Sequence, residues 1–235
     1  MTKRKLSSLF FSVFVVFIFG CTSPTPEQSL IKKVNTDDKS FKGKWLYRSQ
    51  IAGQFAYAVR ARLSVEVDGE KFHLIVKWTE ANPPDRRGVE EWIYDGKLLW
   101  QIIPSQKQVN YLKVKSFKKG PFWKMPSQLK PLAPPKEIGK DTVAERICKV
   151  LQTKGKYEGA DVTLTYWIDE EKNILLKKEH LLEKEGLVLI HESYECEEIE
   201  FTPVFSEKSF EVSVPADWVK VKRQYLNCEF LDTKF

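Results

Sequence analysis

The sequence predicts a mainly β protein of about eleven strands in one domain of roughly 180 residues. In residues 57–67, apolar side chains alternate with polar, mostly charged ones, a period of two that is typical of a strand. Two Asp-Gly pairs, Asp68-Gly69 and Asp95-Gly96, stand between apolar runs and indicate hairpin turns. Several strands, such as 98–103, are apolar on both faces. The second face of the sheet is therefore either covered or lines an apolar cavity.

The stretch from Val89 to Val114 predicts a three-stranded antiparallel meander. Its strands are expected at 89–94, 98–103 and 108–114, with turns at Asp95-Gly96 and at 104–107. It holds no catalytic motif, so function has to be inferred from shape, surface and location. The other expected strands are 43–51, 57–67, 72–78, 142–151, 161–168, 174–182, 187–198 and 209–214.

A proline-rich segment, Ser116–Lys136, interrupts the strand pattern. It contains five prolines and a glycine, yet it also carries several large apolar side chains. A loop of this length is usually polar or functional. Two interpretations stay open: the segment plugs the open end of its own core, or it forms a lid over a ligand cavity.

The first residues predict an export signal. A basic start at Lys3, Arg4 and Lys5 precedes an apolar run that is too short for an ordinary transmembrane helix. Gly20-Cys21 resembles the bacterial lipobox, although Phe19 departs from its usual residue types. That resemblance implies cleavage before Cys21 and lipidation of its sulfur and new amino group, which gives stable membrane attachment. An ordinary secretory signal and an uncleaved anchor are the alternatives.

The expected organisation follows from these segments. Residues 1–20 are a lipoprotein signal peptide, 21–40 the lipidated cysteine and a tether, 41–223 the folded domain and 224–235 a C-terminal tail, expected to be loose. The location is the cell envelope, on either the periplasmic face of an outer membrane or the outer leaflet of the cytoplasmic membrane.

The charge distribution argues against nucleic acid as a partner. Of the net charge of +6, three positive charges lie in the signal peptide, which has no acids, so the mature part carries +3 with both signs interspersed. Such a surface is typical of a solvated domain rather than a nucleic-acid footprint. Export also separates the domain from ATP and NAD, and no cofactor is expected.

Cysteine, histidine and acidic residues give no catalytic or metal site. Cys148, Cys196 and Cys228 allow three disulfide pairings or buried free thiols. If Glu185-Gly186 is a two-residue turn, His180 faces His191, but two histidines do not make a zinc site. No serine-nucleophile motif has a supporting context. Several acidic residues surround Cys196, and we interpret them as a charged strand face. They are Glu192, Glu195, Glu197 and Glu198. The chain is therefore not expected to be an enzyme.

The remaining candidates are large apolar side chains of the meander, the proline-rich segment and a later strand. Each is either ordinary core or the lining of a cavity for an apolar ligand. The predicted ligand-binding residues are Trp92, Trp100, Tyr111, Phe122, Trp123, Met125 and Trp167.

Four motifs within roughly residues 43–218 resemble the LolA-like family, which includes LolA, LolB and RseB. They are Trp92–Trp100 followed by Pro104–Val109, Gly139–Ile147 with Glu145 where glycine is usual, Trp167–Asp169 followed by Leu175–Lys178, and Phe210–Val212 with Pro215. The resemblance implies a half-open antiparallel β-barrel with the proline-rich segment over an apolar concavity. It further implies binding of membrane lipid or lipoprotein acyl chains without chemistry. An RseB-like sensor that binds an envelope protein is the alternative.

Overall fold

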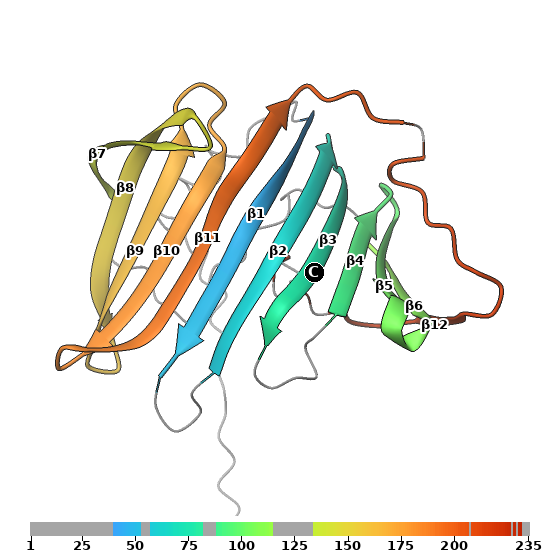
Figure 1. Ribbon diagram of the computed structural model, residues 1–235, viewed down its shortest axis with the longest axis horizontal. Helices are drawn as coiled ribbons and strands as arrows, with labels where there is room; N and C mark the ends of the chain where they lie inside the picture. The colour runs from blue at the N-terminus through green and yellow to red at the C-terminus, as the bar shows by residue number, and fades with distance from the viewer. Residues whose placement is uncertain are drawn as a thin grey trace, which may run out of the picture.

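The computed structural model describes residues 40–52, 57–81, 88–114, 134–206, 208–226, 228, 230 and 231. They form one twelve-stranded sheet in the order β12-β6-β5-β4-β3-β2-β1-β11-β10-β9-β8-β7 (Figure 1). Neighbouring strands are antiparallel except β12 and β6, which are parallel. The sheet is curved but not closed, which confirms the predicted mainly β, half-open architecture. Among the described residues, no helix is long and apolar enough to span a membrane.

Strands β1 to β6 form one half of the sheet, β7 to β11 form the other half, and β12 returns to the edge of the first half. Their bounds are β1 Ser40–Ile51, β2 Tyr57–Asp68, β3 Lys71–Ala81, β4 Gly88–Tyr94, β5 Leu98–Ile103, β6 Gln108–Lys113, β7 Lys136–Val143, β8 Arg146–Tyr157, β9 Ala160–Asp169, β10 Leu175–Lys184, β11 Leu187–Phe201 and β12 Val219–Lys222.

The predicted meander is present as β4, β5 and β6. Asp95 closes its first turn, because its Oδ1 atom accepts the backbone N–H groups of Lys97 and Leu98 at 2.8 Å each. Its Oδ2 atom accepts the indole N–H of Trp100 at 3.0 Å. Partial burial acts to raise the pKa of Asp95, but the hydrogen bonds from Leu98 and Trp100 outweigh it and leave the pKa below its ordinary value. Gly96 supplies the positive φ, +96°, that this turn requires.

Three strand predictions were wrong. The expected strand 142–151 is the end of β7 and the start of β8, because Ala144 and Glu145 both take positive φ and turn the chain. Residues 209–214 are irregular. Strand β12, which was not expected, pairs with the edge strand β6. The predicted proline-rich lid lies almost wholly outside the described residues, and its last residue, Lys136, begins β7.

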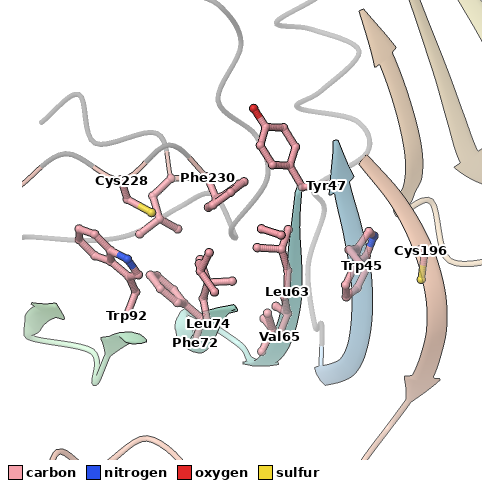
Figure 2. Packing of buried hydrophobic residues seen from close by; sticks show 14 of the residues in the cluster. Trp45, Tyr47, Leu63, Val65, Phe72, Leu74, Trp92, Cys196, Cys228 and Phe230 are labelled. Carbon is pink, nitrogen blue, oxygen red and sulfur yellow. The ribbon is translucent and has the colours of Figure 1, made fainter. Parts of the chain in front are cut away.

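One face of the sheet, here called the apolar face, carries most of the core. Its rows are set by register: Trp45 lies opposite Leu63, and Leu63 lies opposite Val76. Farther along, Leu74 lies opposite Trp92. All five side chains are almost fully buried, as Figure 2 shows for four of them. Alternation in β2 and β3 is what directs these residues to one face.

The C-terminal segment packs on this apolar face, so the expectation of a loose tail was wrong for its described residues. Leu226, Cys228, Phe230 and Leu231 are buried in the main core cluster. The Phe230 ring contacts Tyr47 edge-on, with the ring centres 5.1 Å apart. Figure 2 shows Cys228 and Phe230 beside the side chains that rise from the strands. The tail therefore acts as a second layer over part of the sheet.

The opposite face, here called the charged face, carries rows of paired charges. Lys42 binds Glu200 at 2.8 Å and Lys44 binds Glu198 at 2.7 Å. A hollow of about 440 Å³ lies here, lined by Lys42, Gly43, Lys44, Ser64, Val65, Glu66, Glu198, Ile199 and Glu200. Its charged groups are exposed to solvent and pair with one another, so we interpret the hollow as an ordinary solvated surface.

The three cysteines are buried thiols, which confirms one of the two interpretations of the sequence. Burial raises the pKa of Cys148 to about 11 and that of Cys196 to about 12. Both thiols therefore stay protonated at neutral pH, and protonated thiols are poor nucleophiles.

Candidate functional site

The predicted aromatic residues of the meander lie on two different faces. Trp92 is on the apolar face, where it is 1% exposed and lies between Leu74 and Gln101. Trp100 and Tyr111 lie opposite each other on the charged face, with ring centres 5.3 Å apart. Trp92 is therefore the only described meander aromatic of the predicted set that faces the main core.

Trp167 lies far from the meander, in the other half of the sheet. It is opposite Lys177, whose ammonium is 4.7 Å from the centre of its ring. Its indole N–H donates to Asp141 at 2.9 Å, and this bond lowers the pKa of Asp141. The other predicted residues, Cys21, Phe122, Trp123 and Met125, lie outside the described residues. The structure thus does not bring the described members of the predicted set together.

Replacing Trp100 with phenylalanine should lower the free energy of unfolding by about 1–2 kcal/mol, because the substitution removes the hydrogen bond to Asp95. Ligand affinity should not change, since Trp100 faces away from the apolar face. Chemical denaturation and a lipid-binding titration would measure the two effects separately. A loss of affinity with unchanged stability would instead place the ligand on the charged face.

The most unusual chemistry of the apolar face is a group of polar residues on β1, β10 and β11. This polar cluster consists of Tyr47, Lys178, His180, Glu192 and Tyr194. Register places His180 opposite Glu192 and Lys178 opposite Tyr194. Lys178 is only 4% exposed and His180 only 6%. Lysine is almost never this buried unless it is paired.

Glu192 is the centre of the polar cluster. Its Oε1 atom accepts hydrogen bonds from the hydroxyls of Tyr47 and Tyr194, each at 3.1 Å. Its Oε2 atom lies 3.6 Å from Nδ1 of His180, which is longer than a hydrogen bond. The Lys178 ammonium lies 5.8 Å from the centre of the Tyr194 ring. Burial acts to raise the pKa of Glu192, but the contact with His180 and the charge of Lys178 outweigh it and lower the pKa. Glu192 is therefore a buried carboxylate rather than a neutral acid at pH 7.

This cluster was not predicted from the sequence, because one β-bulge sets the register that forms it. Glu185 and Gly186 do form a two-residue turn, but the register shifts between Leu182 and Glu183. The predicted facing of the two histidines was therefore wrong: His180 lies opposite Glu192, and His191 lies opposite Leu181 on the other face. A slip of one residue moves a side chain to the other face of a sheet.

A second apolar cluster adjoins the polar cluster. It is centred on β9 and consists of Val162, Leu164, Tyr166 and Ile168, here called the β9 patch. Leu164 lies directly opposite His180, and Tyr166 lies directly opposite Lys178. The β9 patch is separate from the core cluster that contains the tail. The apolar face therefore places ionisable side chains side by side with an apolar strip.

This arrangement suits binding of an amphiphile better than a metal. Within the described ranges, no group of three or more His, Cys, Asp or Glu side chains could hold a metal ion. The ionisable side chains of the cluster instead hold one another next to apolar rings. Polar atoms placed at one end of an apolar surface are typical of sites for molecules with a polar head and an apolar chain.

Comparison with known proteins adds structural neighbours of low sequence identity. No protein-family model and no curated protein matches the chain. A MucA/MucB complex from Pseudomonas aeruginosa is similar at 16% identity and a TM-score of 0.44, over 80% of this chain and 60% of that one. An uncharacterized conserved protein from Thermus thermophilus is similar at 17% and 0.42, over 83% and 96%.

A LolA superfamily protein from Nitrosomonas europaea is similar at 16% identity and a TM-score of 0.34, over 81% of this chain and 99% of that one. These structures include the family that the meander motifs resemble. In the MucA/MucB complex and in a second structure of MucB with MucA, the matched region spans only 60% and 58% of the matched chain, less than two thirds of its length.

Proposed function

We propose that the protein is a non-catalytic lipoprotein of the cell envelope, anchored through Cys21, that binds an acyl chain of a lipid or lipoprotein on its apolar face. The observation that carries this proposal is the β9 patch beside the polar cluster. An acyl chain gains about 0.8 kcal/mol for each methylene it buries, so an apolar strip several residues long provides useful affinity.

The position of the C-terminal tail supports binding in this half of the sheet. Phe230 contacts Tyr47, Trp78 and Tyr194 and belongs to the core cluster over the first strands. The C-terminal tail therefore already forms a second layer over the core of β1–β4. The β9 patch, whose side chains are also buried in this structure, belongs to the other cluster, and it is the part of the apolar face that we assign to the ligand.

The proposal predicts that Leu164→Ala lowers the affinity for an acyl chain several-fold. Leu63→Ala is the matched control, because Leu63 is equally buried on the same face but lies in the other cluster. Native mass spectrometry would detect co-purified lipid, and displacement of a fluorescent fatty acid would give affinities. Absence of both bound lipid and displacement would rule the proposal out, as would equal loss of affinity in the two variants.

A second candidate function is docking of an envelope protein, as in a sensor. The observation that favours it is the presence of exposed apolar side chains in two places, at the start of β11 and on β7 and β8. Leu187 is 68% exposed, Val188 46%, Ile138 57% and Ile147 60%. Crosslinking in membranes would separate the two functions, because one stoichiometric protein partner favours the sensor and its absence favours the lipid binder.

A further inference from the structure

We propose that the outer edge of the charged face, formed by β5, β6 and β12, docks on a membrane surface that carries anionic lipids. This surface, here called the edge patch, combines three lysines with a strip of apolar and aromatic side chains. Its main residues are Trp100, Ile102, Tyr111, Lys113, Lys220 and Lys222. The edge patch lies on the opposite face of the sheet from the acyl-chain site, so the inference goes beyond the proposed function.

The apolar strip of the edge patch crosses β5 and β6. Trp100 is opposite Tyr111, with ring centres 5.3 Å apart, and Ile102 is opposite Val109. Trp100, Ile102 and Tyr111 are partly exposed, although each is large and apolar enough for a core position. Trp and Tyr side chains, which have an apolar body and a polar tip, are enriched where proteins meet the headgroup layer of a bilayer.

Three lysines lie directly beside this strip. The parallel pairing of β12 with β6 places Lys220 beside Val109 and Lys222 beside Tyr111. Lys113 follows Tyr111 by two residues on β6, so it points to the same side of the sheet. All three lysines are exposed, and β12 is the last strand at this end of the sheet (Figure 1). Their ammonium groups therefore form a basic rim along the edge of the domain.

The positive charge of the edge patch is not balanced by its own strands. Strands β5, β6 and β12 contain no Asp or Glu, and within the described part of the chain none of the three lysines forms an ion pair. Glu91 of β4, which lies opposite Ile102, is turned to His73, 3.4 Å from its Nε2 atom. On the other half of the charged face, in contrast, Lys42 pairs with Glu200 at 2.8 Å. The edge patch thus has the charge that attracts anionic headgroups.

Protection of the sheet edge does not account for the whole patch. Lysines on an edge strand discourage pairing with other chains, which would explain Lys220 and Lys222. That role requires neither Lys113 on the inner neighbour β6 nor the partly exposed aromatic strip beside it. A bilayer supplies both kinds of partner, because ammonium groups reach the lipid phosphates while the apolar strip enters the headgroup layer. A lipid on Cys21, which the proposed function includes, would hold the domain near such a surface and make a weak contact effective.

The test measures vesicle binding by the mature chain with Cys21→Ser, which cannot be lipidated. Vesicles of phosphatidylcholine with about one third phosphatidylglycerol are compared with vesicles of phosphatidylcholine alone in a sedimentation assay. We expect about tenfold or tighter binding to the anionic vesicles, and weaker binding as the salt concentration rises. Equal binding to the two kinds of vesicle, or none to either, would overturn the proposal. Soluble polyglutamate that binds as tightly as the anionic vesicles would also overturn it, since the partner would then be an acidic polypeptide.

Matched variants locate the contact. Replacing the three lysines of the edge patch by glutamine together should lower the affinity for anionic vesicles about a hundredfold, or about fivefold for each lysine. The control triple variant changes the net charge equally but replaces exposed lysines in the other half of the sheet, and its affinity should change less than about twofold. The control substitutions are Lys149→Gln, Lys154→Gln and Lys184→Gln. Equal losses in the two triple variants would contradict the assignment. Arginine at the three edge positions keeps the charge and should keep the affinity, which guards against a variant that does not fold.

Two single variants separate this contact from the acyl-chain site. Leu164→Ala, in the β9 patch, should leave vesicle binding unchanged. If it lowered vesicle binding as much as the edge-patch triple variant does, the docking proposal would fail while the proposed function would stand. Ile102→Gln, in the apolar strip, should lower vesicle affinity about threefold even at high salt, because apolar contacts are not screened. An unchanged affinity in Ile102→Gln would contradict entry of the strip into the headgroup layer.

Discussion

Replacement of Phe230 by alanine should lower the free energy of unfolding by about 3–5 kcal/mol. Phe230 is 2% exposed, and its ring centre lies 5.1 Å from that of Tyr47 and 5.7 Å from that of Trp78. Removing the ring leaves a cavity between the tail and the sheet. The surrounding strands are hydrogen-bonded on both sides and relax little, so the cost is expected at the level of a core position rather than of a chain end.

Urea denaturation followed by tryptophan fluorescence would measure this effect, since Trp78 reports directly on the contact. Tyr225→Ala is the control: Tyr225 lies in the same tail but is 63% exposed, and its loss should change stability by less than about 0.5 kcal/mol. If the two variants were equally stable, the tail would not form part of the core.

The sequence predicted the local features of the fold well. Asp68-Gly69 and Asp95-Gly96 are turns in the structure, and the meander strands begin and end within about two residues of the expected positions. These features depend on residues a few positions apart, such as the Asp95 side chain and the backbone it caps. Patterns of this kind can be read from a short stretch of the sequence.

The features that the sequence did not predict are non-local. The packing of Phe230 on Tyr47 joins the two ends of the domain, and the parallel pairing of β12 with β6 joins segments about a hundred residues apart. Apolar residues at alternate positions, Leu226, Cys228 and Phe230, were the available sign that the tail is ordered. Composition alone does not say which surface such a segment covers.

The polar cluster was not predicted for the same reason, because it depends on pairing between strands. Lys178 and His180 share the parity of Leu176 and Leu182, so the pattern of β10 marks them as core positions. Their partner Glu192 could not be found from the sequence, because the bulge after Leu182 decides which residue of β11 faces His180. The predicted aromatic residues Trp92, Trp100 and Tyr111 lie in the meander, while the polar cluster lies on the other side of the sheet, around β10 and β11.

The second prediction with a large expected effect on stability concerns the turn between β9 and β10. Asp169→Ala should lower the free energy of unfolding by about 2–4 kcal/mol at pH 7. The Asp169 side chain is fully buried, and it accepts hydrogen bonds from Nε of Arg146 at 2.7 Å and from the backbone N–H of Glu171 at 3.0 Å. It also accepts the backbone N–H of Lys172. Its removal takes away the shared acceptor of these donors and leaves Arg146 without its main partner.

The contribution of Asp169 should depend on pH in one direction. Burial acts to raise the pKa of Asp169, but the hydrogen bonds from Arg146 and from the Lys172 backbone outweigh it, so the folded-state pKa lies below the ordinary value of 3.8. In the unfolded chain the pKa returns to about 3.9. The stabilisation is therefore complete above that unfolded value and is lost as the pH falls through the folded one.

Unfolding of the wild type and of Asp169→Asn at pH 7 and near pH 3 would check this expectation. Asparagine keeps the shape of the side chain but not its charge, so the gap in stability should be widest at pH 7 and narrow at low pH. Glu171→Gln is the control, because Glu171 pairs with the same guanidinium at 2.7 Å but is exposed. Its effect should be small at both pH values, since water replaces an exposed carboxylate easily. A gap that stayed constant with pH would mean that shape and hydrogen bonding, rather than the charge on Asp169, hold this turn.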